Sequence, residues 1–213
     1  MKFLTIFSFC CFYWGLPVQA ALTLYYGNTD GGGGFLRDIN GVTLTTGSKD
    51  NPGNGAVIQL GYYTLAITTD PFAGDWVALA GPGTSVETAN IGEILGSTYV
   101  NSGLFGGTAT FNSASASHPD ISTPLAIRFY DNTSIANSTY YNAVSMTDWR
   151  WSSPTSGNNS LDMTIPGPGI PGLVWQGGEA SAYRTTMPIP EPSALLLASL
   201  AGSSVLVRRR RLE

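Results

Sequence analysis

Histidine and cysteine are almost missing from this chain of 213 residues, which has one histidine and two cysteines. Cys10 and Cys11 lie in an apolar stretch at the N-terminus, so a domain that begins after it has no disulfide and no thiol nucleophile. His118 precedes Pro119 in a Ser/Ala-rich stretch that predicts a solvated loop, and the chain has no GxSxG motif. One histidine without cysteine excludes ordinary zinc and copper sites, and no cofactor is expected.

Positive charge is also scarce in the middle of the chain. Residues 21–189 contain five basic residues against twelve acidic ones, which leaves seven net negative charges. Nucleic acids and anionic membrane surfaces are bound through basic surfaces, so we expect no nucleic-acid partner. Lysine and glutamate are few in this part, whereas glycine, serine, threonine and aromatic residues are common, which favours strands and turns over helices.

Apolar residues alternate with polar ones between Gly- and Pro-rich turns, which predicts about ten short strands. In residues 125–130, for example, Leu125, Ile127 and Phe129 share one face, while Arg128 and Tyr130 share the other. The predicted strands are residues 22–26, 42–46, 56–69 (with a bulge at Gly61), 76–80, 98–100, 108–111, 125–130, 140–151 and 161–165, and a last hairpin of 173–175 and 180–184. This pattern predicts an all-β fold, an antiparallel β-sandwich or jelly roll.

One short helix is predicted within this domain, over residues 84–96. Thr84 or Ser85 could cap its N-terminus, although Gly92 weakens the helix.

Residues 1–20 have the features of a cleaved signal peptide. A lysine precedes an apolar segment over residues 3–16, and Val18 and Ala20 are suitable residues at the −3 and −1 positions. We therefore expect export and cleavage between Ala20 and Ala21. The alternative is a retained membrane anchor, for which fourteen apolar residues are few.

Three features follow one another in residues 190–213: Pro190, Glu191 and Pro192, an apolar run over residues 193–207, and the basic block of Arg208, Arg209, Arg210 and Arg211. As a helix the run would be about 22 Å long, against a hydrocarbon core of about 30 Å. The arginines would stay on the cytoplasmic side, and the prolines would keep the motif outside the hydrophobic helix.

This order of motif, apolar helix and arginine cluster resembles the PEP-CTERM sorting signal. The resemblance implies recognition by an exosortase, a membrane-embedded cysteine transpeptidase-like enzyme of the bacterial envelope. The protein would be held in the membrane transiently before processing and would then reach the cell surface or the extracellular space. The segment QLGYY…DPFAGDWVALAG of residues 59–81 also resembles a recurring core of small exported PEP-CTERM proteins. The alternative is an accidental Pro-Glu-Pro in a tail-anchored or single-pass protein.

The function of the domain at residues 21–189 stays open among three hypotheses. The first is a non-catalytic envelope protein with a structural or exopolysaccharide-matrix role. The second is a carbohydrate-binding module that uses Trp149 and Trp151, whose spacing places both indoles on one face of a strand. Exposed indoles would stack on sugar rings, whereas buried ones would belong to the core.

Carboxylates are the remaining candidates for chemistry. A hydrolase with two opposed acids is a third hypothesis, and a calcium site made of turn oxygens is a further possibility. The default expectation is that the aspartates in turns form local hydrogen bonds with the backbone, as Asx-turns do. The aspartates with turn-like neighbours are Asp30, Asp50, Asp70, Asp120 and Asp131.

Overall fold

The strand that begins the domain, β1 (Ala21–Gly27), has the alternation of buried and exposed residues that its sequence predicts. Leu22, Leu24 and Tyr26 point into the protein, while the side chain of Tyr25 is 48% exposed on the other face. β1 pairs in parallel with β10 (Asn158–Thr164) and antiparallel with β7 (Gly106–Asn112). It therefore lies between the two other long strands of the smaller sheet.

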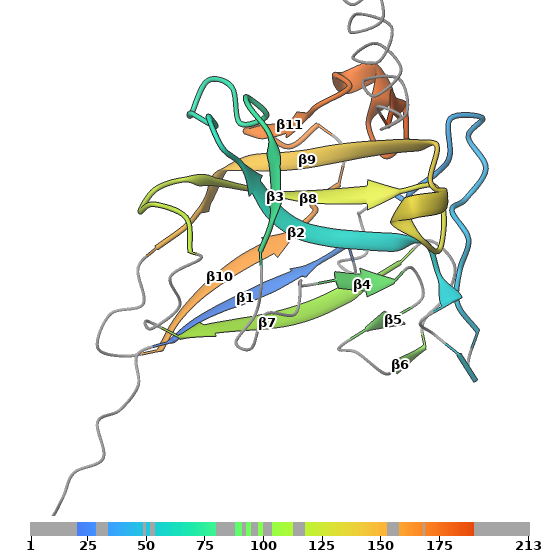
Figure 1. The fold of residues 1–213 in the computed structure, drawn as a ribbon, viewed down its shortest axis with the longest axis horizontal. Helices are drawn as coiled ribbons and strands as arrows, with labels where there is room; N and C mark the ends of the chain where they lie inside the picture. Colours follow the sequence, from blue (N-terminus) through green and yellow to red (C-terminus); the bar gives the residue numbers. More distant parts are fainter. Residues whose placement is uncertain are drawn as a thin grey trace, which may run out of the picture.

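The chain forms two sheets that face one another in this computed structural model (Figure 1). The structure describes residues 21–28, 34–48, 50–51, 54–79, 88–90, 93–94, 98–99, 104–112, 118–152, 158–167 and 169–189. The smaller sheet has the order β10-β1-β7-β5-β6, in which β5 is Glu93–Ile94 and β6 is Thr98–Tyr99.

The larger sheet has the order β11-β9-β8-β2-β3, and two further short strands pair with β9 and β2. Its members are β2 (Val57–Tyr63), β3 (Trp76–Ala78), β4 (Thr88–Asn90), β8 (Pro124–Tyr130), β9 (Tyr140–Arg150), β11 (Leu173–Trp175) and β12 (Met187–Pro188). All its pairings are antiparallel, while the smaller sheet contains two parallel pairings, β1 with β10 and β5 with β7.

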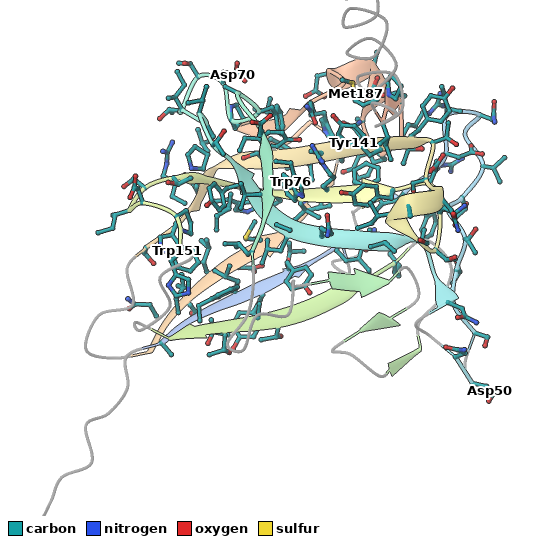
Figure 2. All side chains as sticks on the ribbon, viewed as in Figure 1. Asp50, Asp70, Trp76, Tyr141, Trp151 and Met187 are labelled. Atoms are coloured by element: carbon teal, nitrogen blue, oxygen red, sulfur yellow. The ribbon has the colours of Figure 1, made fainter. Side chains whose placement is uncertain are left out.

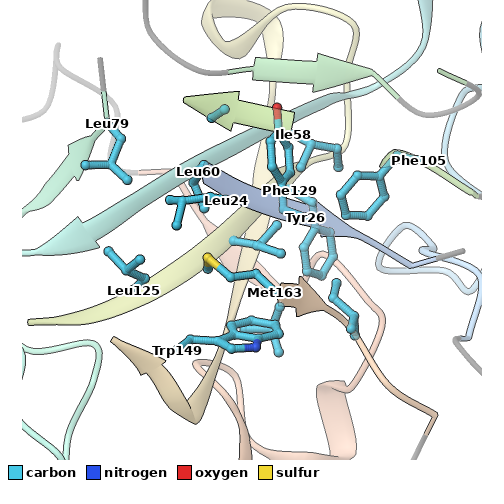
Figure 3. Close-up of a cluster of buried hydrophobic side chains, with 14 of the residues drawn as sticks. Leu24, Tyr26, Ile58, Leu60, Leu79, Phe105, Leu125, Phe129, Trp149 and Met163 are labelled. Atoms are coloured by element: carbon cyan, nitrogen blue, oxygen red, sulfur yellow. The ribbon is translucent and has the colours of Figure 1, made fainter. Parts of the chain in front are cut away.

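A single large cluster of buried apolar side chains fills the space between the sheets (Figure 3). β1 contributes Leu24 from the smaller sheet, and β2 and β8 contribute Ile58 and Phe129 from the larger one. Each fully buried side chain of this kind contributes about 1.5–3 kcal/mol through the apolar surface that it removes from water. The all-β sandwich predicted from the sequence is therefore confirmed.

The helix predicted over residues 84–96 is wrong where the structure describes this segment. β4 pairs with β2 along residues 57–59, and β5 pairs with both β6 and β7. Gly92 makes the local helix preference weak, so pairing with existing sheet edges prevails over it. The helices that lie wholly within the described residues are three-residue 3-10 turns, η2 (Ile135–Asn137) and η3 (Glu179–Ser181).

Three further details differ from the sequence-based prediction. Residues 42–46 form one isolated bridge, between Arg37 and Thr43, instead of a strand. β2 ends at Tyr63 and has no bulge at Gly61, because its register with β8 runs without a shift from Ile58 to Tyr62. The expected last hairpin is absent from the described residues: β11 pairs with β9, and residues 179–181 form η3.

Residues 1–20 and 190–213 lie outside the described part of the chain, and so do the predicted signal peptide and the C-terminal apolar helix. Neither of the short helices in the described part is long and apolar enough to cross a bilayer.

Candidate functional site

Trp149 and Trp151 do not form the exposed platform that sugar stacking requires. Each indole is only 2% exposed, and both belong to the main core cluster. Trp149 lies near the end of β9 and Trp151 just after it, where the register of β9 with β8 is irregular between the Ala126–Ser145 and Pro124–Arg150 pairs. The carbohydrate-binding hypothesis therefore cannot rest on this pair.

His118 lies in a loop, as expected, but its side chain is half-buried instead of fully solvated, and it packs against Trp151, which follows β9. Its ring lies 4.8 Å from the ring of Trp151 and 5.7 Å from that of Phe111. Burial lowers the pKa of His118 below its ordinary value, because the charged imidazolium loses water there. These contacts assign His118 a packing role at the edge of the core.

Of the residues named for the two predicted processing signals, the structure describes Ala21 alone. Ala21 opens β1 and is paired with Asn112 and Asn158. Ala20 lies outside the described residues, as do Pro190, Glu191, Pro192 and the arginines at positions 208–211.

Of the five aspartates expected to bond the backbone in turns, Asp70 does so as in an Asx-turn and Asp131 does so across the connection from β8 to β9, while Asp30 lies outside the described residues. Asp70 accepts one from Phe72 N at 3.2 Å, and Asp131 accepts two, from Thr139 N and Tyr140 N. The part of the chain that the structure describes contains no group of three or more His, Cys, Asp or Glu side chains placed to hold a metal ion.

The candidate site lies on the outer face of the larger sheet, opposite the core. Residues that alternate with the core positions of β2, β8 and β9 point to this face, where large side chains such as Tyr63 and Arg128 lie beside small residues such as Ala126. Tyr63, Ala126 and Ala143 form a second buried cluster there, against which Phe72 and Trp76 pack. The corresponding face of the smaller sheet carries exposed positions such as Tyr25. Among the residues that the structure describes, the larger sheet thus has side chains packed over its outer face.

Trp76 of β3 and Tyr141 of β9 both lie on this face (Figure 2). The close approach of the Trp76 ring to β2 depends on Gly61, because a Cβ at that position would lie 2.6 Å from the ring. The indole N–H of Trp76 donates a hydrogen bond to Gln59 Oε1 at 3.2 Å, and Tyr130 OH donates to the same oxygen at 2.7 Å. Gln59 therefore fixes the orientation of two rings on this face.

Arg128 projects from β8 into the middle of these rings. Its guanidinium carbon lies 4.2 Å from the ring centroid of Tyr141, 4.6 Å from that of Trp76 and 5.3 Å from that of Tyr63. A cation over aromatic faces at such distances is stabilised by the ring quadrupoles, by about 0.5–2 kcal/mol for each favourable contact. Three rings thus surround one half-buried positive charge.

Hydrogen bonds connect Arg128 to Gln176 through the hydroxyl of Tyr63. Arg128 Nη2 donates to Tyr63 OH at 2.9 Å, and Tyr63 OH donates to Gln176 Oε1 at 2.6 Å. Burial raises the pKa of Tyr63 to about 12, although the Arg128 charge and its hydrogen bond oppose this shift. The Tyr63 hydroxyl therefore keeps its proton at physiological pH and holds Gln176 in place.

An open pocket of about 320 Å³, the aromatic pocket, lies over Arg128 and its surrounding rings. Its volume is in the range of sites that hold small ligands or single sugar units. It combines ring faces with three kinds of polar group: a guanidinium, a carboxylate and an amide. The residues that line it are Tyr63, Gly74, Asp75, Trp76, Arg128, Tyr130, Ile135, Tyr141, Gln176 and Ile189.

A second, wider hollow of about 540 Å³ lies beside it and shares Tyr63. The exposed apolar residues Leu65 and Ile67 line one side of this hollow, and His118 and Asp120 line the other. It lacks a buried polar network like that of Arg128, so we take the aromatic pocket as the candidate site.

Sequence reasoning missed this site because its residues come from distant segments. The sequence does place Arg128 and Tyr130 on one face of their strand. The register of β8 with β9 then sets Arg128 opposite Ala143 and Tyr130 opposite Tyr141. No local pattern predicts that Trp76 lies on the same face.

The sequence matches no protein-family model, and no curated protein or solved structure matches the chain.

Proposed function

We propose that this protein is an exported, non-catalytic envelope protein that is sorted by a C-terminal PEP-CTERM signal. It would serve a structural or exopolysaccharide-matrix role after an exosortase-type enzyme has processed it. The observation that carries this proposal is the order of Pro190-Glu191-Pro192, apolar run and arginine block in the sequence.

The positions of the first and last described strands are compatible with this route. β1 begins at Ala21, so cleavage after Ala20 would leave every described strand pairing intact. β12 ends at Pro188, just before the Pro-Glu-Pro motif. The motif would then leave the sandwich as an extended segment, because proline fixes its own backbone and restricts the residue before it.

Replacing Pro190, Glu191 and Pro192 with alanine should leave the protein in the membrane fraction in unprocessed form. The apolar run and the arginines would still hold the chain in the membrane, since arginine resists transfer through hydrocarbon. Removing the four arginines instead should weaken retention. The measurement is immunoblotting of membrane and released fractions from a host that has the sorting enzyme.

Pro188→Ala is the matched control, because it removes an exposed proline two residues before the motif and should leave processing unchanged. Maturation and release of the triple-alanine variant at the parental level would show that the motif is accidental and that the protein is only tail-anchored.

A second candidate function is saccharide binding by the aromatic pocket on the outer face of the larger sheet. The observation that favours it is the combination of the half-buried indole of Trp76 with the polar groups of Asp75, Arg128 and Gln176 in one pocket. Sugars present apolar C–H faces to aromatic rings and hydroxyl groups to polar side chains at their rims. This function is compatible with a role in an exopolysaccharide matrix.

A further inference from the structure

Arg128 carries a positive charge that no carboxylate of the described residues neutralises. Its one hydrogen bond to a described residue is to the neutral hydroxyl of Tyr63. Nε is buried without a partner, and such a donor costs about 1–3 kcal/mol relative to a satisfied one. The three aromatic rings offset part of this cost.

Nη1 of Arg128 is the unused end of the guanidinium. It donates no hydrogen bond to a described residue and, unlike Nε, is not among the enclosed unpaired atoms. Because Arg128 lines the pocket, a ligand in the pocket can accept from Nη1 and from the second N–H of Nη2. Two parallel N–H groups of this kind match the two oxygens of a carboxylate.

We propose that the aromatic pocket binds a carboxylated sugar, such as a uronic acid unit, with Arg128 binding the carboxylate and the half-buried ring of Trp76 contacting the sugar, while the buried ring of Tyr141 holds the guanidinium in place. This inference rests on the proposed saccharide-binding function and specifies its ligand. The rings restrict the approach to the guanidinium, so a flat-faced ligand with one carboxylate fits better than a bulky anion.

Asp75 sets the orientation of the ligand within the pocket. Its carboxylate forms no hydrogen bond with another described residue, whereas its backbone N–H donates to Thr64 Oγ1. A carboxylate can accept hydroxyl protons from the sugar but repels the sugar's own carboxylate. The ligand is therefore placed with its acid group toward Arg128 and its hydroxyls toward Asp75.

The charge of the whole domain limits the class of anion further. Seven net negative charges over residues 21–189 repel densely charged polyanions such as sulfated chains. A saccharide with one carboxylate per sugar unit meets less of this repulsion at a single pocket.

The test measures binding of the protein purified from its envelope fraction to short oligomers of glucuronate, galacturonate and mannuronate. Each oligomer is compared with its carboxyl-reduced form, in which every carboxylate has become a CH₂OH group. Titration calorimetry should show at least one uronate oligomer binding roughly tenfold or more tightly than its reduced form, as expected for the loss of a charge-assisted contact.

Arg128→Gln should remove this preference, and Arg128→Lys should keep only part of it, because lysine lacks the planar fork. Arg37→Gln is the control, since it removes the same charge from an exposed position outside the pocket and should change nothing. The comparison of each oligomer with its reduced form uses the unaltered protein, so it holds even if an Arg128 variant fails to fold.

Equal binding of every oligomer and its reduced form would overturn the carboxylate inference while leaving saccharide binding intact. Absence of binding to all of these sugars would overturn both. Displacement of the uronate oligomers by an oligoglutamate peptide at equal concentration would assign the pocket to acidic peptides and overturn the sugar assignment.

Discussion

Replacing Trp149 with alanine is expected to lower the free energy of unfolding by about 3–5 kcal/mol, the largest effect of any single change to the core. The indole is 2% exposed and lies in the cluster that joins the two sheets, close to Met163 of β10 (Figure 3). Its removal would leave a cavity that rigid strands on both sides cannot close. The domain has no disulfide to limit the loss, because no cysteine follows Cys11.

Urea denaturation of the purified protein measures this effect. If only stability is altered, the slope of the unfolding free energy against urea concentration should stay the same. Trp149→Phe should lose less, since a ring still fills part of the space. Val174→Ala serves as a surface control, because Val174 is 42% exposed on β11 and its truncation should have little effect. A change below about 1 kcal/mol for Trp149→Ala would contradict the buried position of the indole, given the usual cost of such cavities.

Raising the pH from 10 to 12 is expected to destabilise the fold by about 2 kcal/mol through Tyr63 alone. The pKa of this tyrosine is raised from 10.0 to about 12 by burial. Between these values the unfolded chain loses the phenolic proton while the folded chain keeps it. The contribution is therefore fully present below pH 10 and is lost as the pH rises through the folded pKa.

The measurement is the free energy of unfolding as a function of pH for the parent and for Tyr63→Phe. The variant loses the hydrogen bonds to Arg128 and Gln176, so it should be less stable at neutral pH. Its stability should nevertheless fall less steeply above pH 10, and the difference between the two curves isolates Tyr63 from Tyr130 and Tyr183, whose pKa values burial also raises. Parallel curves would show that the Tyr63 hydroxyl is not buried.

Local pattern was sufficient to predict the long strands of this fold. Leu22, Leu24 and Tyr26 alternate with polar or exposed residues, and the structure buries these three in the core. Strong alternation of this kind specifies both the strand and its inner face, because side chains along a strand point to opposite sides in turn.

Pairing between distant segments accounts for what the sequence did not predict. Residues 88–90 have no strong preference of their own, and they form β4 because the edge of β2 is available to them. The parallel pairing of β1 with β10 joins segments more than 130 residues apart, and nothing in either segment indicates its partner.

The aromatic pocket was missed for the same reason, although part of its signal is present in the sequence. Arg128 at an outward position of an otherwise apolar strand is unusual, since a charged residue there must be solvated or paired. Its partners, the rings of Trp76 and Tyr141, are identified only by the strand order of the larger sheet. The Trp149 and Trp151 pair was the more visible aromatic signal, and its burial shows that spacing alone does not distinguish a binding face from a core face.

The intact mass of the protein recovered from the cell envelope and the surrounding medium tests the proposed export and sorting most directly. We expect a chain that begins at Ala21 and lacks the C-terminal segment that contains Arg208–Arg211. Recovery of the full chain of 22.5 kDa, beginning at Met1 and ending at Glu213, would contradict both processing steps.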